Sequence, residues 1–92
     1  MEKVRIHVYI SGYVQGVFFR SNTKDMAERF NLTGWVKNLP DGRVEVMAEG
    51  EKDKIEEFIR FLKRGPSFSR VEDVEIKIEK FSDEFDGFSI IH

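Results

Sequence analysis

The sequence predicts an α+β sandwich, with two helices packed on one face of an antiparallel sheet of four to five strands. Several segments alternate between apolar and polar residues, which is typical of strands with one buried face. Two other segments carry a single apolar stripe at helical spacing. These segments follow one another in the order strand, helix, strand, strand, helix, strand, and two helices covering one face of such a sheet bury every apolar stripe.

The first half of the chain begins with a strand over residues 3–11, whose apolar side carries Val4, Ile6, Val8 and Ile10. The first helix is expected over residues 21–30, because Thr23, Met26, Ala27 and Phe30 share one face. Ser21 and Asn22 are N-cap candidates, and Asn31 suits the left-handed position that ends a helix.

The middle of the chain predicts a hairpin followed by the second helix. Residues 34–39 and 43–49 read as strands joined by a Pro-Asp-Gly turn at residues 40–42. The second helix, over residues 52–64, has the clearest apolar stripe of the chain, formed by Ile55, Phe58, Ile59 and Leu62. Gly65 and Pro66 end it.

The last third predicts a strand over residues 71–81 and a short final strand over residues 88–91. Val71 is out of phase with the alternation that begins at Val74, which indicates either a bulge or a transition from loop to strand near residues 72–73. The acidic segment 82–87 reads as a turn. The order βαββαβ with a short fifth strand is that of a ferredoxin-like sandwich, a fold that hosts many functions.

Composition limits the classes of function. Ninety-two residues form a single domain, 1–92, and the net charge is −2 with both signs interleaved, so no nucleic-acid surface is expected. The absence of cysteine removes disulfides, thiolate metal sites and cysteine nucleophiles. No apolar run approaches the roughly 20 residues that span a bilayer, so we expect no membrane partner, a cytoplasmic location and a monomer.

The stretch from residue 10 to residue 20 is the candidate functional segment. It leads from a strand through Gly12 and Gly16 to Arg20 at the start of a helix. Glycines let backbone N–H groups converge, a helix start supplies unpaired donors, and arginine matches phosphate geometry. The segment by itself is equally compatible with a plain loop whose arginine is solvated.

Two motifs together resemble the signatures of the acylphosphatase family. The first runs Val-Gln-Gly-Val-Phe-Phe-Arg over residues 14–20, preceded by Gly12. The second runs Gly-Trp-Val-Lys-Asn over residues 34–38 and is followed by Gly42, Val44 and Gly50. They lie in the family's order and spacing, and the resemblance spans essentially the whole chain.

The resemblance implies a hydrolase that cleaves acyl phosphates to a carboxylate and inorganic phosphate without metal or cofactor, with phosphate as product and competitive inhibitor. The family's essential residues match Arg20 and Asn38, which makes these two the expected catalytic residues. The phosphoryl group is expected to bind the segment formed by Gln15, Gly16, Val17, Phe18, Phe19 and Arg20. Asn38 is expected to orient the attacking water, with a phosphoryl oxygen taking its proton.

The sequence is also compatible with two other functions. The chain could be a non-catalytic module that binds phosphate or an acyl phosphate, or, less consistently with Glu45 on the open strand face, an RNA-binding domain. Phe18 and Phe19 read as core and pocket wall rather than as specificity elements. His92 reads as a frayed terminal residue, and a contact between its carboxylate and Arg20 is a hypothesis carried by the resemblance alone.

Overall fold

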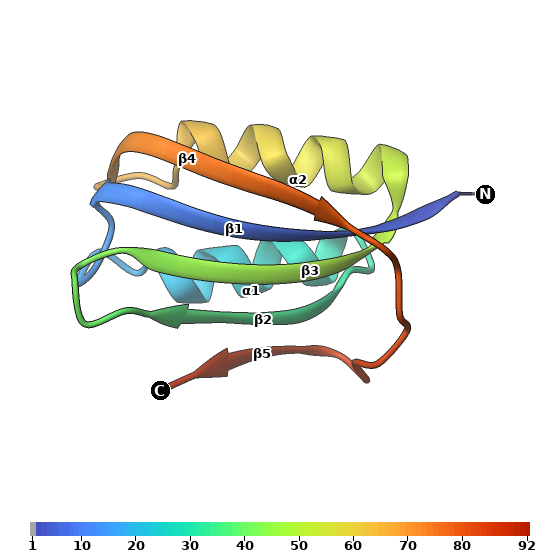
Figure 1. Cartoon of the computed structure of the whole chain (residues 1–92). Coiled ribbons are helices and arrows are strands. Elements are labelled where there is room, and N and C mark those ends of the chain that lie inside the picture. The colour runs from blue at the N-terminus through green and yellow to red at the C-terminus, as the bar shows by residue number, and fades with distance from the viewer. Residues whose placement is uncertain (1) are drawn as a thin grey trace.

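Five strands form one sheet in a computed structural model that describes residues 2–92. The strands are β1 (Lys3–Tyr13), β2 (Thr33–Asn38), β3 (Val44–Glu51), β4 (Arg70–Glu79) and β5 (Phe88–Ile91), and their spatial order is β4-β1-β3-β2-β5. The helices α1 (Phe19–Arg29) and α2 (Lys52–Arg64) both lie behind the sheet in the view of Figure 1. This arrangement confirms the predicted ferredoxin-like α+β sandwich.

One part of the sheet prediction is wrong, because β5 pairs with β2 in parallel rather than antiparallel orientation. Gly34 lies opposite Phe88 and Lys37 opposite Ile91. The physical reason is the path of the chain: after β4 it crosses one end of the sheet and enters the far edge in the direction of β2 (Figure 1). The sheet is therefore mixed.

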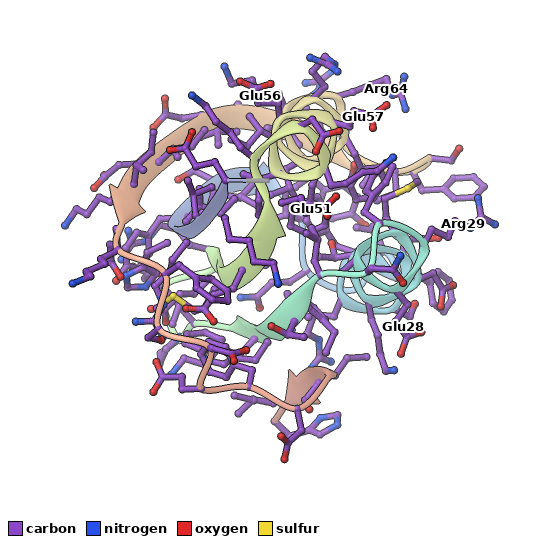
Figure 2. All side chains as sticks on the ribbon, turned by 90° about the vertical axis from the view of Figure 1, so that its right-hand side faces the viewer. Glu28, Arg29, Glu51, Glu56, Glu57 and Arg64 are labelled. Atoms are coloured by element: carbon purple, nitrogen blue, oxygen red, sulfur yellow. The ribbon has the colours of Figure 1, made fainter. Side chains whose placement is uncertain are left out.

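The core lies between the sheet and the two helices, as the apolar stripes predict. Ile6, Val8 and Ile10 of β1 are fully buried, and they face a helix layer that contributes buried Ala27, Ile55, Phe58 and Leu62. The outer helix surfaces are charged, and Figure 2 shows Glu28 and Arg29 on α1 and Glu56 on α2 pointing away from the sheet. No helix between residues 2 and 92 is long and apolar enough to cross a bilayer.

The predicted bulge between the first and fourth strands is confirmed. Ser11 lies opposite Asp73, but Gly12 lies opposite Val71, so Glu72 is the extra residue. Gly12 has φ +128°, and a Cβ there would lie 2.1 Å from the carbonyl oxygen of Arg70. Only glycine permits this approach, which sets the direction in which β1 enters the following loop.

The open face of the sheet is partly closed by the segment that connects β4 to β5. Glu49, which is 1% exposed, accepts hydrogen bonds from the Ser82 N–H (2.9 Å), the Ser82 hydroxyl (2.8 Å) and the Asp83 N–H (3.1 Å). The Nε of Arg5 lies 3.2 Å from the same carboxylate, close enough for an ion pair although it is not aligned as a hydrogen bond. The acidic segment is thus fastened to the sheet through Glu49 and is more than a turn.

Candidate active site

The β1–α1 loop, the end of β2 and the C-terminus lie close together at one end of the sheet, at the left of Figure 1. A hollow of about 370 Å³ opens among these elements. It is lined by Val14, Gly16, Phe18, Arg20, Ser21, Asn38, Ile90 and His92. Both sequence motifs therefore contribute to one concave surface, together with β5. A hollow of this volume lies within the range of small-molecule binding sites.

The loop between β1 and α1 is anchored to the core by two buried side chains and is exposed to solvent between them. Val14 and Val17 are buried, at 1% and 5% exposure, so the loop is pinned to the core at two points. Gly16 between them is exposed, and a Cβ there would meet nothing within 4 Å, but its φ is +77°. The conformation, rather than lack of space, is what requires glycine here.

Helix α1 begins without a side-chain cap. It starts at Phe19, two residues before the predicted start, and its N-cap Phe18 has left-handed backbone angles, φ 63° and ψ 23°. The prediction that Ser21 or Asn22 caps the helix is wrong, because both lie inside the first turn and donate to the Phe18 carbonyl, at 3.2 and 2.9 Å. The N–H groups of the first turn are therefore not bonded to a capping side chain and face the end where an anion can bind.

Arg20 lies in this first turn and lines the hollow. Among residues 2–92 no carboxylate forms an ion pair with it, whereas Arg5 and Arg43 each pair with a carboxylate. Its Nη1 lies 3.4 Å from Nδ1 of His92. The terminal histidine is thus part of the hollow, and its imidazole is the group that the structure brings to Arg20.

Asn38 is the last residue of β2 and contributes to the same hollow. Its side-chain oxygen Oδ1 is buried and has no hydrogen-bond partner among the described residues. Leaving a buried acceptor unpaired costs about 1–3 kcal/mol, so Asn38 is a candidate ligand-binding or water-binding residue of this lining.

Gln15 links the two motifs through its side chain, a role the sequence did not reveal. Its Nε2 donates to the carbonyl oxygens of Leu39 (2.8 Å) and Arg43 (2.9 Å), both in the β2–β3 hairpin. These bonds hold the β1–α1 loop against the strand end that carries Asn38. No local sequence signal could have indicated a contact between residues 24 and 28 positions apart.

Apart from Gln15, whose side chain is bonded to the hairpin and does not line the hollow, the predicted site residues fall into two groups. Gly16, Phe18, Arg20 and Asn38 line the hollow, whereas the side chains of Val17 and Phe19 belong to the core. For these two buried residues only the backbone can take part in binding. Sequence reasoning missed Val14, Ser21 and Ile90 as lining residues. It gave a contact between His92 and Arg20 only through the resemblance and for the terminal carboxylate, whereas the structure brings the imidazole to Arg20.

The charge around the hollow suits an anion. Among residues 2–92 none of the lining residues is acidic, and Arg20 contributes a positive charge. A second hollow of about 230 Å³ has three carboxylates in its lining, against the two lysines Lys3 and Lys54, so its charge suits an anion less well. The described residues contain no group of three His, Asp or Glu side chains placed to hold a metal ion.

Comparison with known proteins places the chain in a family. The family model "Acylphosphatase" matches residues 6–90. A curated acylphosphatase of Rubrobacter xylanophilus is 50% identical over 86 residues, which cover 94% of this chain and 78% of that protein.

Solved structures agree with this match. The crystal structure of acylphosphatase from Bacillus subtilis superposes with a TM-score of 0.93 at 36% identity and covers 97% of this chain and 99% of that one. Full-length HypF, in a phosphate- and nucleotide-bound form, superposes with a TM-score of 0.86 at 30% identity, over 99% of this chain but only 12% of HypF. An uncapped helix start, an unpaired arginine and a glycine loop in one hollow fit these similarities, and the chain belongs to the acylphosphatase family of hydrolases that act on acyl phosphates.

Proposed function

We propose that the chain cleaves the carboxyl–phosphate bond of acyl phosphates by direct attack of water on phosphorus. The phosphoryl oxygens bind the guanidinium of Arg20 and backbone N–H groups of residues 15–20. The attacking water is held by Asn38. The products are a carboxylate and inorganic phosphate, and no metal or cofactor takes part.

The observation that carries this proposal is that Asn38, whose buried Oδ1 has no hydrogen-bond partner among the described residues, lines the same hollow as Arg20. An amide oxygen accepts a hydrogen bond from water, and because the amide is neutral it does not repel an anionic substrate as a carboxylate would. A site that only binds phosphate has no need of an unpaired acceptor in its wall, whereas a site that orients water does.

The reaction requires the protein mainly to position the reactants and to stabilise charge on the transferring phosphoryl group. The carboxylate of an acyl phosphate is a good leaving group, so no strong general acid is required. The oxygen of water bonds to phosphorus as the phosphorus–oxygen bond to the acyl group breaks, and the water proton passes to a phosphoryl oxygen. Arg20 and the uncapped first turn of α1 stabilise the charge on the transferring group throughout.

The test is hydrolysis of benzoyl phosphate in EDTA, with inorganic phosphate as competitive inhibitor, by wild type, Arg20→Ala and Asn38→Ala. Wild type should turn over without metal. Arg20→Ala should lose both turnover and phosphate inhibition, because the charged fork that holds the phosphoryl group is gone. Asn38→Ala should lose roughly 10²-fold or more in kcat and still be inhibited by phosphate, because only the water is misplaced.

Two control variants come from the other end of α1. Arg29→Ala removes an exposed arginine of the last turn, and Asn31→Gly replaces a residue at φ 58° with one that tolerates it. Both should keep wild-type kinetics. An Asn38→Ala enzyme that keeps full activity would contradict the assignment of water positioning to that residue.

The second candidate, a non-catalytic module that binds phosphate or acyl phosphate, rests on the similarity to a small part of HypF. The same assay, with calorimetry added, separates the two functions. A binding module would not hydrolyse benzoyl phosphate, but calorimetry would still detect the binding of phosphate to it. Every group in the catalytic scheme comes from one chain, so we also propose that the protein is a monomer, which light scattering would test. Its proposed ligand is the acyl phosphate, and we propose no nucleic-acid or membrane partner.

A further inference from the structure

Phe18 combines two properties that are unusual for a phenylalanine. Its side chain is 75% exposed, whereas the neighbouring Phe19 is 1% exposed and belongs to the core. Its backbone adopts φ 63°, a left-handed conformation that bulky residues rarely take. The two adjacent phenylalanines of the first motif therefore have separate roles, and Phe18 has none in the packing of the core.

The strained backbone of Phe18 is held firmly in place. Its carbonyl oxygen accepts three hydrogen bonds, from the Asn22 N–H (3.1 Å), the Asn22 side-chain amide (2.9 Å) and the Ser21 hydroxyl (3.2 Å). Residues kept in sparsely populated conformations by their surroundings cluster at functional sites. The aromatic ring is thus presented from a fixed backbone at the very start of α1.

The hollow has a polar part and an apolar part. Arg20, Asn38 and the first-turn N–H groups are the polar part, where the phosphoryl group binds in the proposed mechanism. Phe18 and the half-buried Ile90 contribute exposed apolar surface to the same lining. An acyl phosphate has a matching division, with a charged end and an organic end joined through one oxygen.

We propose that Phe18 determines the acyl-group preference, and that the preferred substrates are acyl phosphates with an aromatic or bulky apolar acyl group. The ring of Phe18 packs against that group while the phosphoryl end occupies the polar part, and Ile90 contributes further apolar contact. The inference rests on the proposed function, because it takes the phosphoryl group to lie beside Arg20 and Asn38. A small acyl group such as acetyl gains almost nothing from the ring.

The experiment compares kcat/KM for benzoyl phosphate with kcat/KM for acetyl phosphate in wild type, Phe18→Leu and Phe18→Asn. Asparagine tolerates the left-handed conformation, so the loop keeps its shape while the apolar surface is lost. Any effect on the phosphoryl end acts on both substrates and cancels in the ratio. The benzoyl-to-acetyl ratio should fall about tenfold in Phe18→Asn, equivalent to about 1.4 kcal/mol, and by a smaller factor in Phe18→Leu, which stays apolar.

Phe68 provides a matched control. It is also a phenylalanine with positive φ (73°), it is 83% exposed, and it is not among the residues that line the hollow. Phe68→Asn relieves the same kind of backbone strain and should leave the ratio unchanged. Thermal unfolding of each variant verifies that the compared proteins are folded at the assay temperature.

The inference is overturned if the ratio in Phe18→Asn equals that of wild type, or if Phe68→Asn lowers it as much. Failure of the underlying mechanism looks different, because it appears as retained activity in Arg20→Ala or Asn38→Ala with both substrates. A ratio that falls in the order wild type, Phe18→Leu, Phe18→Asn supports the assignment.

Discussion

Replacing Gln15 with methionine tests whether the two motifs depend on each other through a single side chain. Methionine is close to glutamine in shape but cannot donate, so Gln15→Met removes the bonds to the carbonyls of Leu39 (2.8 Å) and Arg43 (2.9 Å) without adding charge. The Leu39 carbonyl keeps a bond from the Gly42 N–H, and the Arg43 carbonyl keeps one from the Leu39 N–H. Neither acceptor is left without a partner.

The magnitude follows from that count. Two net hydrogen bonds of about 0.5–1.5 kcal/mol each, with both acceptors still partly satisfied, lower the free energy of unfolding by about 1–2 kcal/mol. In a domain of this size the melting temperature should drop by roughly 5–15 °C. The effect on catalysis should be larger, because the strand end that carries Asn38 loses its link to the β1–α1 loop, which is proposed to bind the phosphoryl group. A displacement of about 1 Å can lower the rate 10²-fold.

The assay combines urea unfolding with steady-state hydrolysis of benzoyl phosphate. We expect kcat to fall by roughly 10- to 100-fold, while inhibition by phosphate changes little, because Arg20 and the first turn of α1 do not contact Gln15 through its side chain. Ser69→Ala is the control, since its hydroxyl also donates to a backbone carbonyl, that of Pro66 at 2.6 Å, outside the hollow. It should lose stability but keep kcat. A Gln15→Met enzyme that is destabilised yet fully active would refute the positioning argument.

Two further predictions concern the open face of the sheet. Glu49→Gln should lower the free energy of unfolding by about 2–4 kcal/mol in urea titration. The buried carboxylate accepts hydrogen bonds from Ser82 and Asp83, whereas a glutamine amide would direct its NH₂ group toward one of these donors. Unchanged stability would show that the bonds form equally well to a neutral group. Partial burial, as the larger cause, and the nearby Glu45 carboxylate, as the next, raise the pKa of the Tyr9 phenol above its usual value of 10.0. Folding therefore favours the protonated phenol. The stability that this contributes is present below about pH 10 and is lost as the pH rises through the folded-state pKa. Ultraviolet titration should show a late phenol transition that moves down in Glu45→Gln.

The elements that could be predicted from the sequence are those set by local patterns. The alternation in β1 and the stripe of Ile55, Phe58 and Leu62 in α2 fix which face is buried whatever the rest of the chain does. The phase change at Val71 likewise revealed the bulge at Glu72, because a single inserted residue shifts a period of two.

The features that escaped prediction depend on contacts between distant segments. The parallel pairing of β5 follows from the route of the chain around the end of the sheet, which four residues of strand pattern do not encode. The early start of α1 depends on Phe18 taking a conformation that its residue type disfavours. The inclusion of His92 in the hollow depends on β5 lying beside β2, so a residue that looked frayed lies 3.4 Å from Arg20.

Four locally unfavourable features meet in the hollow, and three of them have an explanation in the proposed mechanism. In that mechanism an anion supplies acceptors to the uncapped start of α1 and a counter-charge to Arg20, and a water satisfies Oδ1 of Asn38. The left-handed, exposed Phe18 gains nothing from a phosphoryl group, because its ring is apolar. Backbone strain alone does not indicate function, since Phe68 is strained as well and lies outside the hollow. What distinguishes Phe18 is that it lines the same hollow as Arg20 and Asn38 with an exposed apolar ring, and that is the reason to seek the acyl preference there.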